Sequence, residues 1–266
     1  MNDAGSGFSS HKVTLDMGDM GLVGFDQGTG AFGIGTIDDK SPTAYEEIWN
    51  GTAQSNGDIL DANGGSSGVF GYINTFSGFK VNVEYAPSLS SADAGDGASG
   101  GATTVADGTS LNFAITNSSM VDGLNFGFGH GENDYDHASG DIDSIDGKSS
   151  TAYVNYAFGP TTIGVQQSYT SGSVSANNTT IGANEVTIMG IAFNVNDNLS
   201  ISYTDYENKY LKSRSSADVT QDMDGINLAY TMGGATLRVT DTSVTNAGGT
   251  ANKSEDRTEV SLLMAF

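Results

Sequence analysis

Apolar and polar residues alternate along most of this chain with a period of two. In the C-terminal segment, Val260, Leu262 and Met264 share one face and Glu259 and Ser261 share the other. This alternation is typical of β-strands with one apolar face. Twelve such segments lie near residues 11–17, 68–77, 79–87, 109–119, 124–131, 151–158, 161–171, 185–195, 199–208, 224–232, 235–245 and 255–266. The sequence therefore predicts an all-β protein.

The segment near 185–195 departs from this alternation. Val186 and Ile188 have the opposite parity to Met189, Ile191 and Phe193. A β-bulge, which inserts one extra residue, would bring both groups to the same face. We therefore expect a bulge in this strand.

The connections between the predicted strands alternate between short and long. The short ones are residue 78 and residues 120–123, 159–160, 196–198 and 233–234, and the long ones are 18–67, 88–108, 132–150, 172–184, 209–223 and 246–254. A strand meander that crosses a bilayer has tight turns at one end and large loops at the other. The pattern predicts a transmembrane antiparallel up-and-down β-barrel of twelve strands in a single domain, residues 1–266.

The composition agrees with a barrel whose interior is polar. Only 37% of the 266 residues are apolar, and such a barrel needs no apolar core. The second face of the strands carries small and polar residues with a few charges, so Lys80, Glu84, Arg238 and Glu259 are candidates for the lumen wall. Aromatic residues gather near the strand ends, which is typical of the membrane interface: Phe76, Phe79, Tyr85, Phe158, Tyr169 and Tyr230.

Charge and cysteine content exclude several other classes of protein. Ten basic against 32 acidic residues give a formal charge of −22, which argues against nucleic-acid binding because a phosphate-binding surface needs clustered Lys and Arg. The absence of cysteine excludes a disulfide framework and thiol chemistry. The N-terminal sequence MNDAGSGFSS has neither the basic region nor the apolar stretch of a signal peptide.

Several segments resemble the trimeric general-diffusion porins of Gram-negative outer membranes, particularly the alphaproteobacterial type. The last strand, EVSLLMAF, ends in Phe266, which is similar to the terminal aromatic signal for barrel assembly in that family. The hairpin FSGFKVNVEYA, residues 76–86, is similar to the hairpin that follows the porin constriction loop, and KVTLDMGD, residues 12–19, resembles the strand that enters it. Residues 18–67 would then be the constriction loop, folded into the barrel.

The resemblance implies an outer-membrane channel through which ions and small hydrophilic solutes diffuse without turnover or cofactor. It also implies a homotrimer in contact with outer-membrane lipid and lipopolysaccharide. The family has sixteen strands, and its constriction loop follows the fifth, whereas here the loop follows the first predicted strand. We expect a relative that lacks the first four strands and the signal peptide; a barrel that closes with twelve strands is the alternative.

The long loop contains five acidic candidates for a pore constriction: Asp26, Asp38, Asp39, Glu46 and Glu47. In the family, the corresponding carboxylates lie across the pore from basic side chains, and the resulting field filters solutes by charge. Acidic residues in excess over Lys80 and Arg238 would favour cations. The alternative interpretation is ordinary solvated loop charge.

A second acidic group, Asp141, Asp143 and Asp146, has the oxygen-rich spacing of Ca²⁺ ligands but lacks the closing glutamate of an EF-hand. A Ca²⁺ ion bound there is one interpretation. A hydrated loop that faces lipopolysaccharide through divalent ions is the other.

The sequence gives no support for catalysis, and we expect no enzymatic activity. The histidines, His11, His130 and His137, lie in none of the known ligand or catalytic spacings. Two alternatives to a channel remain. One is a non-conducting outer-membrane barrel, an adhesin or surface-structure protein acting through residues 88–108 and 132–150. The other is a soluble calcium-dependent β-protein, although the tandem G-G-x-G-x-D repeats expected of it are absent.

Overall fold

The computed structural model describes residues 10–52, 68–87, 108–135, 147–171, 181–212 and 217–264. These residues form thirteen strands: β1 (His11–Asp16), β2 (Leu22–Gln27), β3 (Val69–Phe76), β4 (Phe79–Ala86), β5 (Gly108–Asn117), β6 (Leu124–Tyr135), β7 (Gly147–Phe158), β8 (Thr161–Ser171), β9 (Ile181–Asn196), β10 (Leu199–Lys212), β11 (Val219–Met232), β12 (Ala235–Thr245) and β13 (Glu255–Met264). Three short 3-10 helices accompany them: η1 (Gly18–Met20), η2 (Ile34–Ile37) and η3 (Ala247–Gly249). Among the described residues, none of the helices has the length and apolar character needed to cross a bilayer.

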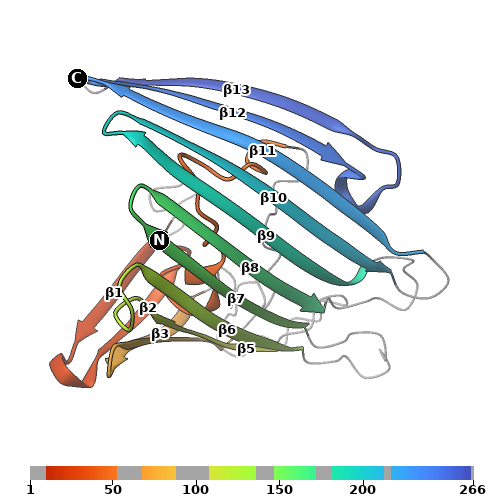
Figure 1. The fold of residues 1–266 in the computed structure, drawn as a ribbon. Helices are drawn as coiled ribbons and strands as arrows, with labels where there is room; N and C mark the ends of the chain where they lie inside the picture. Colours follow the sequence, from red (N-terminus) through yellow and green to blue (C-terminus); the bar gives the residue numbers. More distant parts are fainter. Residues whose placement is uncertain are drawn as a thin grey trace, which may run out of the picture.

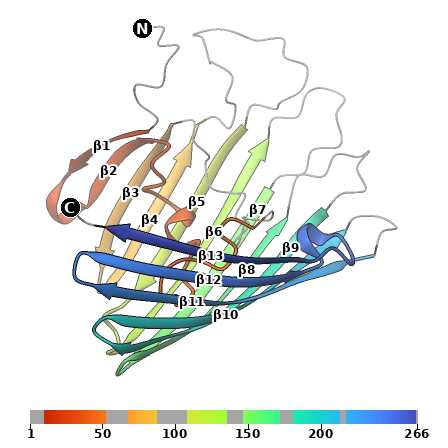
Figure 2. The same cartoon turned by 90° about the horizontal axis from the view of Figure 1, so that it is seen from above.

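All thirteen strands belong to one antiparallel sheet in which each strand pairs with its neighbours in sequence (Figure 1). The sheet curves around an interior space, here called the lumen, and its edges are β1 and β13 (Figure 2). The all-β, up-and-down prediction is therefore confirmed. The closed twelve-strand alternative is not what the described residues form, because β13 pairs with β12 and β1 with β2, but not with each other.

The additional strand, β2, lies inside the segment that the sequence analysis assigned to a continuous loop, residues 18–67. A short connection through η1 joins β1 to β2, with Asp16 opposite Leu22 at its base. The prediction missed β2 because the strand has only six residues and Gly24 interrupts its apolar alternation. The segment that leaves the sheet therefore begins after Gln27, and its described part, residues 28–52, is here called the inner segment.

The alternation of short and long connections is present in the structure. Residues 17–21, 77–78, 118–123, 159–160, 197–198 and 233–234 connect strands at one end of the sheet, here called the short-turn end. The strand ends that flank residues 28–68, 87–107, 136–146, 172–180, 213–218 and 246–254 lie at the opposite end of the sheet, here called the long-loop end. The added hairpin β1–β2 extends this alternation by one short connection.

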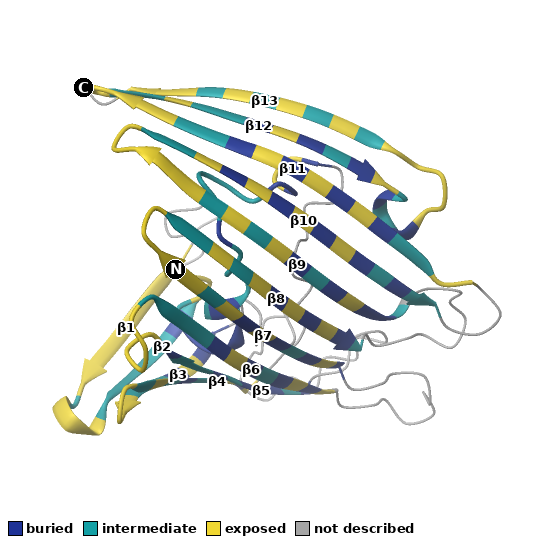
Figure 3. Ribbon diagram, viewed as in Figure 1, coloured by how far each residue is buried: buried dark blue, intermediate teal, exposed yellow. Residues whose placement is uncertain are grey.

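The two faces of the sheet have opposite chemistry, and the stripes along the strands in Figure 3 follow it. Outward side chains are apolar and exposed: Phe128 is 46% exposed, Ile226 57% and Val260 65%. Inward side chains are mainly polar and covered: Asn112 is fully buried and Gln166 is 1% exposed. This arrangement reverses that of a water-soluble protein and is the one a strand sheet needs when lipid surrounds it.

The predicted bulge does not lie where the parity changes: the register of β9 against β10 shifts only near its two ends, at Val195 and Gly182. The β9–β10 pairing is continuous from Asn194, opposite Ser200, to Ala183, opposite Leu211. Val186 and Ile188, each 1% exposed, instead point inward and pack with Ile48 and other buried residues. The parity change in the sequence therefore marks a place where both faces of the strand are apolar, because part of the inner segment covers the inner face there.

Two paired glycines create the surface on which the inner segment enters the lumen. Gly24 of β2 lies opposite Gly71 of β3. A Cβ atom at Gly71 would lie 2.0 Å from the ring of Phe32, and one at Gly24 would lie 2.6 Å from the same ring. The Phe32 side chain, 2% exposed, therefore packs directly on two strand backbones.

Gly71→Val should displace Phe32 and lower the free energy of unfolding by about 3 kcal/mol, the cost typical of losing a buried aromatic contact. Gly35→Ala is the matched control, because a Cβ atom at Gly35 meets no atom within 4 Å. Urea unfolding of the refolded protein in detergent measures both variants. Equal stability of the two variants would contradict this packing.

Candidate functional site

The inner segment lies along the inner face of the sheet and is held there by side chains of the wall. At its first end, the backbone N–H of Gly33 donates to Asn82 Oδ1 of β4 at 3.0 Å. The next N–H, of Ile34, donates to Asn112 Oδ1 of β5 at 2.8 Å. Gly33 fits closely, since a Cβ atom there would lie 1.8 Å from Asn112 Oδ1. Two wall amides therefore fix the start of η2.

The middle of the inner segment is held by Gln166 of β8. Its Oε1 accepts the backbone N–H of Lys40 at 2.8 Å, and its Nε2 donates to the carbonyl oxygens of Ile37 at 2.9 Å and Asp38 at 2.7 Å. Asn155 of β7 donates to the carbonyl of Lys40. A single buried amide thus binds three backbone groups of the segment.

The last part of the inner segment is bonded to β10, β11 and β12. Ser202 Oγ accepts the backbone N–H of Ala44 at 2.9 Å. Asn227 Nδ2 donates to Thr43 Oγ1 at 3.0 Å and to the carbonyl of Glu46. Thr242 Oγ1 donates to the carbonyl of Ile48 at 2.9 Å. Hydrogen bonds therefore continue along the wall as far as the next-to-last strand.

An apolar cluster adds to these hydrogen bonds near the long-loop end of β9–β12. Ile48, fully buried, and Trp49, 5% exposed, pack with buried residues of the wall: Val186, Ile188, Tyr206, Met223, Val244 and Ala247. The rings of Trp49 and Tyr206 are 5.6 Å apart with an interplanar angle of 46°. The cluster removes the Trp49 ring from water and anchors the end of the inner segment.

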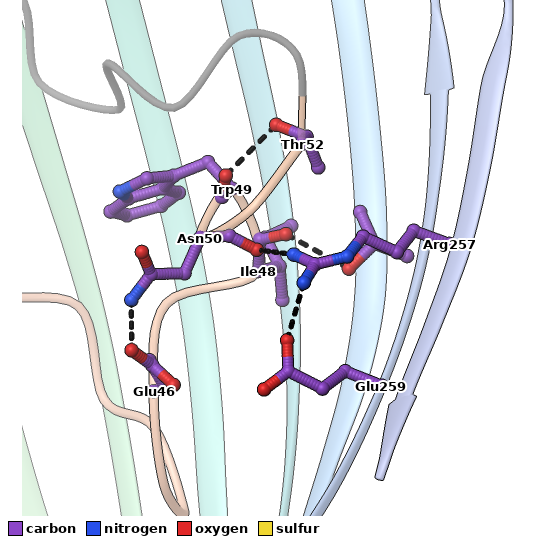
Figure 4. A network of polar contacts seen from close by, with 8 residues as sticks. Glu46, Ile48, Trp49, Asn50, Thr52, Arg257 and Glu259 are labelled. Atoms are coloured by element: carbon purple, nitrogen blue, oxygen red, sulfur yellow. Dashed lines mark hydrogen bonds and ion pairs between the residues drawn. The ribbon is translucent and has the colours of Figure 1, made fainter.

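Arg257 of β13 completes the attachment (Figure 4). Its guanidinium donates to the carbonyl of Asn50 and forms an ion pair with Glu259, two residues further along the same strand. Glu46 in turn accepts from the side-chain amide of Asn50. Arg257 is not among the residues predicted from the sequence, although its parity with Glu259 on β13 places it on the inward face.

The predicted constriction acid Asp26 has a different environment from the one expected. It lies on β2 and not in a loop, and only 1% of it is exposed. Its carboxylate accepts the backbone N–H groups of Thr29 at 3.0 Å and Ala31 at 2.8 Å, and the Thr29 hydroxyl at 2.7 Å. Asp26 therefore holds the turn that leads into the lumen and does not line open space.

The other four acidic candidates lie on the inner segment in two pairs. Asp38 and Asp39 follow η2 near β8, and Glu46 and Glu47 lie near β11. Asp39 is exposed, and the other three are partly exposed. Partial burial raises the pKa of the Asp38 carboxyl, and the adjacent N–H of Asp39 and the charge of Lys40 oppose that rise.

The four candidates for the lumen wall all point inward but differ in accessibility. Glu84 is 5% exposed and accepts from Asn112 Nδ2 at 3.0 Å. The inner segment covers it, since a Cβ atom at Gly33 would lie 2.7 Å from Glu84 Cβ. Arg238 places its guanidinium carbon 4.2 Å from the centre of the Tyr45 ring, a cation–π contact. Glu259 pairs with Arg257, and Lys80 is exposed.

The remaining candidates lie outside the described residues. These are the proposed calcium ligands Asp141, Asp143 and Asp146 and the proposed assembly signal Phe266. Within the described ranges, no group of three or more Asp, Glu or His side chains is arranged to hold a metal ion. Calcium binding and the role of Phe266 stay predictions.

Comparison with known structures identifies the fold as that of the outer-membrane porins. A porin refined at 1.8 Å matches with a TM-score of 0.60 at 12% identity, over 92% of this chain and 78% of its own. An anion-selective porin from Comamonas acidovorans matches with a TM-score of 0.61 at 14% identity, over 97% and 77%. OmpT, an outer membrane protein of Vibrio cholerae, matches in its trimer form with a TM-score of 0.54 at 14% identity, over 91% and 76%. No family model and no curated protein matches the sequence.

Asp26→Ala should loosen the entry of the inner segment and lower the free energy of unfolding by about 2–3 kcal/mol, because two backbone N–H groups lose a charged acceptor. Asp122→Ala, at an exposed position of a short turn, is the control and should have little effect. Urea unfolding measures stability, and limited proteolysis within residues 28–52 reports the loosening. Resistance to protease equal to that of the parent would contradict the proposed role.

Proposed function

We propose that the protein is a passive channel of the bacterial outer membrane for ions and small hydrophilic solutes. The observation that carries the proposal is the combination of an apolar outward face with a polar lumen that the inner segment narrows. An apolar outward face matches a lipid environment, and a polar inner wall matches a path for water and solutes. The porin fold supports the same conclusion.

The inner segment is the proposed filter. Its hydrogen bonds to the wall fix it in the lumen, so size exclusion requires no moving part. Its exposed or partly exposed acids, Asp38, Asp39, Glu46 and Glu47, add a negative potential. Glu259 offsets the charge of Arg257, and the guanidinium of Arg238 lies over the ring of Tyr45. We therefore propose a preference for cations, without turnover or cofactor.

We also propose that the channel works as a homotrimer in contact with outer-membrane lipid and lipopolysaccharide. The support for a trimer is analogy with OmpT, which adopts a trimer form with this fold. Outward side chains such as Ile226 and Val260 provide an apolar surface for lipid or for a neighbouring subunit. A non-conducting barrel that acts through its long loops is the competing proposal.

Reconstitution in a planar bilayer should give stepwise conductance and a reversal potential, in a KCl gradient, of the sign expected for a cation-preferring pore. The double variant Asp38→Asn with Asp39→Asn should lower the cation-to-anion permeability ratio about twofold, since it removes two lumen charges. Asp122→Asn, outside the lumen segment, should leave that ratio unchanged.

The same ratio should fall as pH decreases. Burial raises the pKa of Asp38, so its negative charge is lost at a higher pH than that of an ordinary aspartate. Marked anion selectivity of the parent would refute the proposed filter. A complete lack of conductance in folded, inserted protein would favour the non-conducting barrel.

A further inference from the structure

A cavity lies between η2, with the residues that follow it, and the inner face of β4–β7. Its volume is about 230 Å³, whereas a single water needs only ~15 Å³ of such space. It is lined by two lysines and by hydroxyl and amide side chains, among them Lys40, Lys80, Asn82, Thr116, Ser118 and Asn125. None of the lining residues is acidic, although the whole chain has a formal charge of −22.

The two lysines come from different parts of the fold. Lys80 lies on β4 directly opposite Thr116 of β5. Lys40 belongs to the inner segment, where Gln166 binds its N–H and Asn155 its carbonyl, so its backbone is fixed on both sides. Among the described residues, neither ammonium group lies within ion-pair distance of a carboxylate, although the charge of Lys40 acts on the carboxyl of Asp38, two residues before it. Two cationic groups therefore face one polar space.

The amide side chains of the cavity have their oxygen atoms occupied. Asn125 Oδ1 accepts the hydroxyl of Tyr153 at 2.9 Å. Asn82 Oδ1 accepts the N–H of Gly33 at 3.0 Å. The Nδ2 group of Asn125 has no hydrogen-bond partner among the described residues and remains a donor. Asn82 Nδ2 donates to Thr36 Oγ1 at 3.3 Å, so the donors left for a ligand are the two ammonium groups, the Nδ2 group of Asn125 and the hydroxyl groups of Thr116 and Ser118.

We propose that this cavity is a binding site for a small oxyanion, such as phosphate or a short carboxylate. The proposal rests on the proposed channel, because the ligand reaches the cavity from the lumen. Lys40 and Lys80 supply charge, and Thr116, Ser118 and the Nδ2 group of Asn125 supply neutral donors, a combination that forms charge-assisted hydrogen bonds to oxyanions. The site adds local anion binding to a pore whose remaining exposed acids favour cations.

Inorganic phosphate is the probe for the test, with the full chain in planar bilayers. Millimolar phosphate added to a KCl solution should reduce the single-channel current of the parent in a saturable way. Lys80→Gln and Lys40→Gln should each weaken the effect about tenfold, as the loss of one charge-assisted contact predicts. Lys80→Arg should retain it. Lys253→Gln is the matched control, because Lys253 is exposed in the connection between β12 and β13.

Acetate and sulfate in parallel distinguish a carboxylate site from a site for tetrahedral oxyanions. A parent current unaffected by phosphate, acetate or sulfate would overturn the inference while the channel itself stands. The inference would also be overturned if Lys253→Gln weakened the oxyanion effect on the current as much as Lys80→Gln does. Such an effect would depend on surface charge and not on the cavity. Binding can also be measured without conductance, by the broadening of the phosphate line in ³¹P NMR of the detergent-solubilised protein. Broadening that is lost in Lys80→Gln would support the site even if no conductance occurred. In that case only the proposed channel would fail.

Discussion

Hydrogen bonds between the inner wall and the backbone of residues 28–52 are the interaction on which the rest of this structure depends. The inner segment has little regular secondary structure, so its N–H and C=O groups need partners elsewhere. Asn82, Asn112, Gln166, Asn227 and Thr242 provide them from five strands. The polar face of the sheet therefore does more than contact water. It binds the segment that gives the lumen its shape and charge.

Apolar contacts complement these bonds at the two ends of the segment. Phe32 packs on the paired backbones at Gly24 and Gly71, and Trp49 packs within the cluster that includes Val186 and Tyr206. Amides in the middle and apolar anchors at both ends fix the segment along its length. Asp39 is exposed on the segment, whereas the buried Asp26 holds the backbone at its start.

The sequence predicts the strands and their meander well, because an apolar outward face and a polar inward face impose a period of two. The prediction fails where the inner segment packs against a strand. The apolar residues Val186 and Ile188 have the wrong parity for the outward face because Ile48 of the inner segment covers them. Gly24 interrupts the apolar alternation of β2 because the ring of Phe32 occupies the space of a side chain there. The alternation correctly predicts that the side chains of Lys80 and Arg238 point inward. It does not predict the burial of Asp26 and Glu84, since that burial depends on contacts distant in sequence.

Cysteine cross-linking tests most directly whether the segment lies along the wall, and the chain has no native cysteine to interfere. The N–H of Ala44 is 2.9 Å from Ser202 Oγ, whereas the next residue, Tyr203, points outward with 43% of its surface exposed. The double variant Ala44→Cys with Ser202→Cys should form a disulfide in folded, detergent-solubilised protein. The pair Ala44→Cys with Tyr203→Cys should not. Failure of the first pair to cross-link, or equal cross-linking of both, would contradict a segment bound to the inner wall.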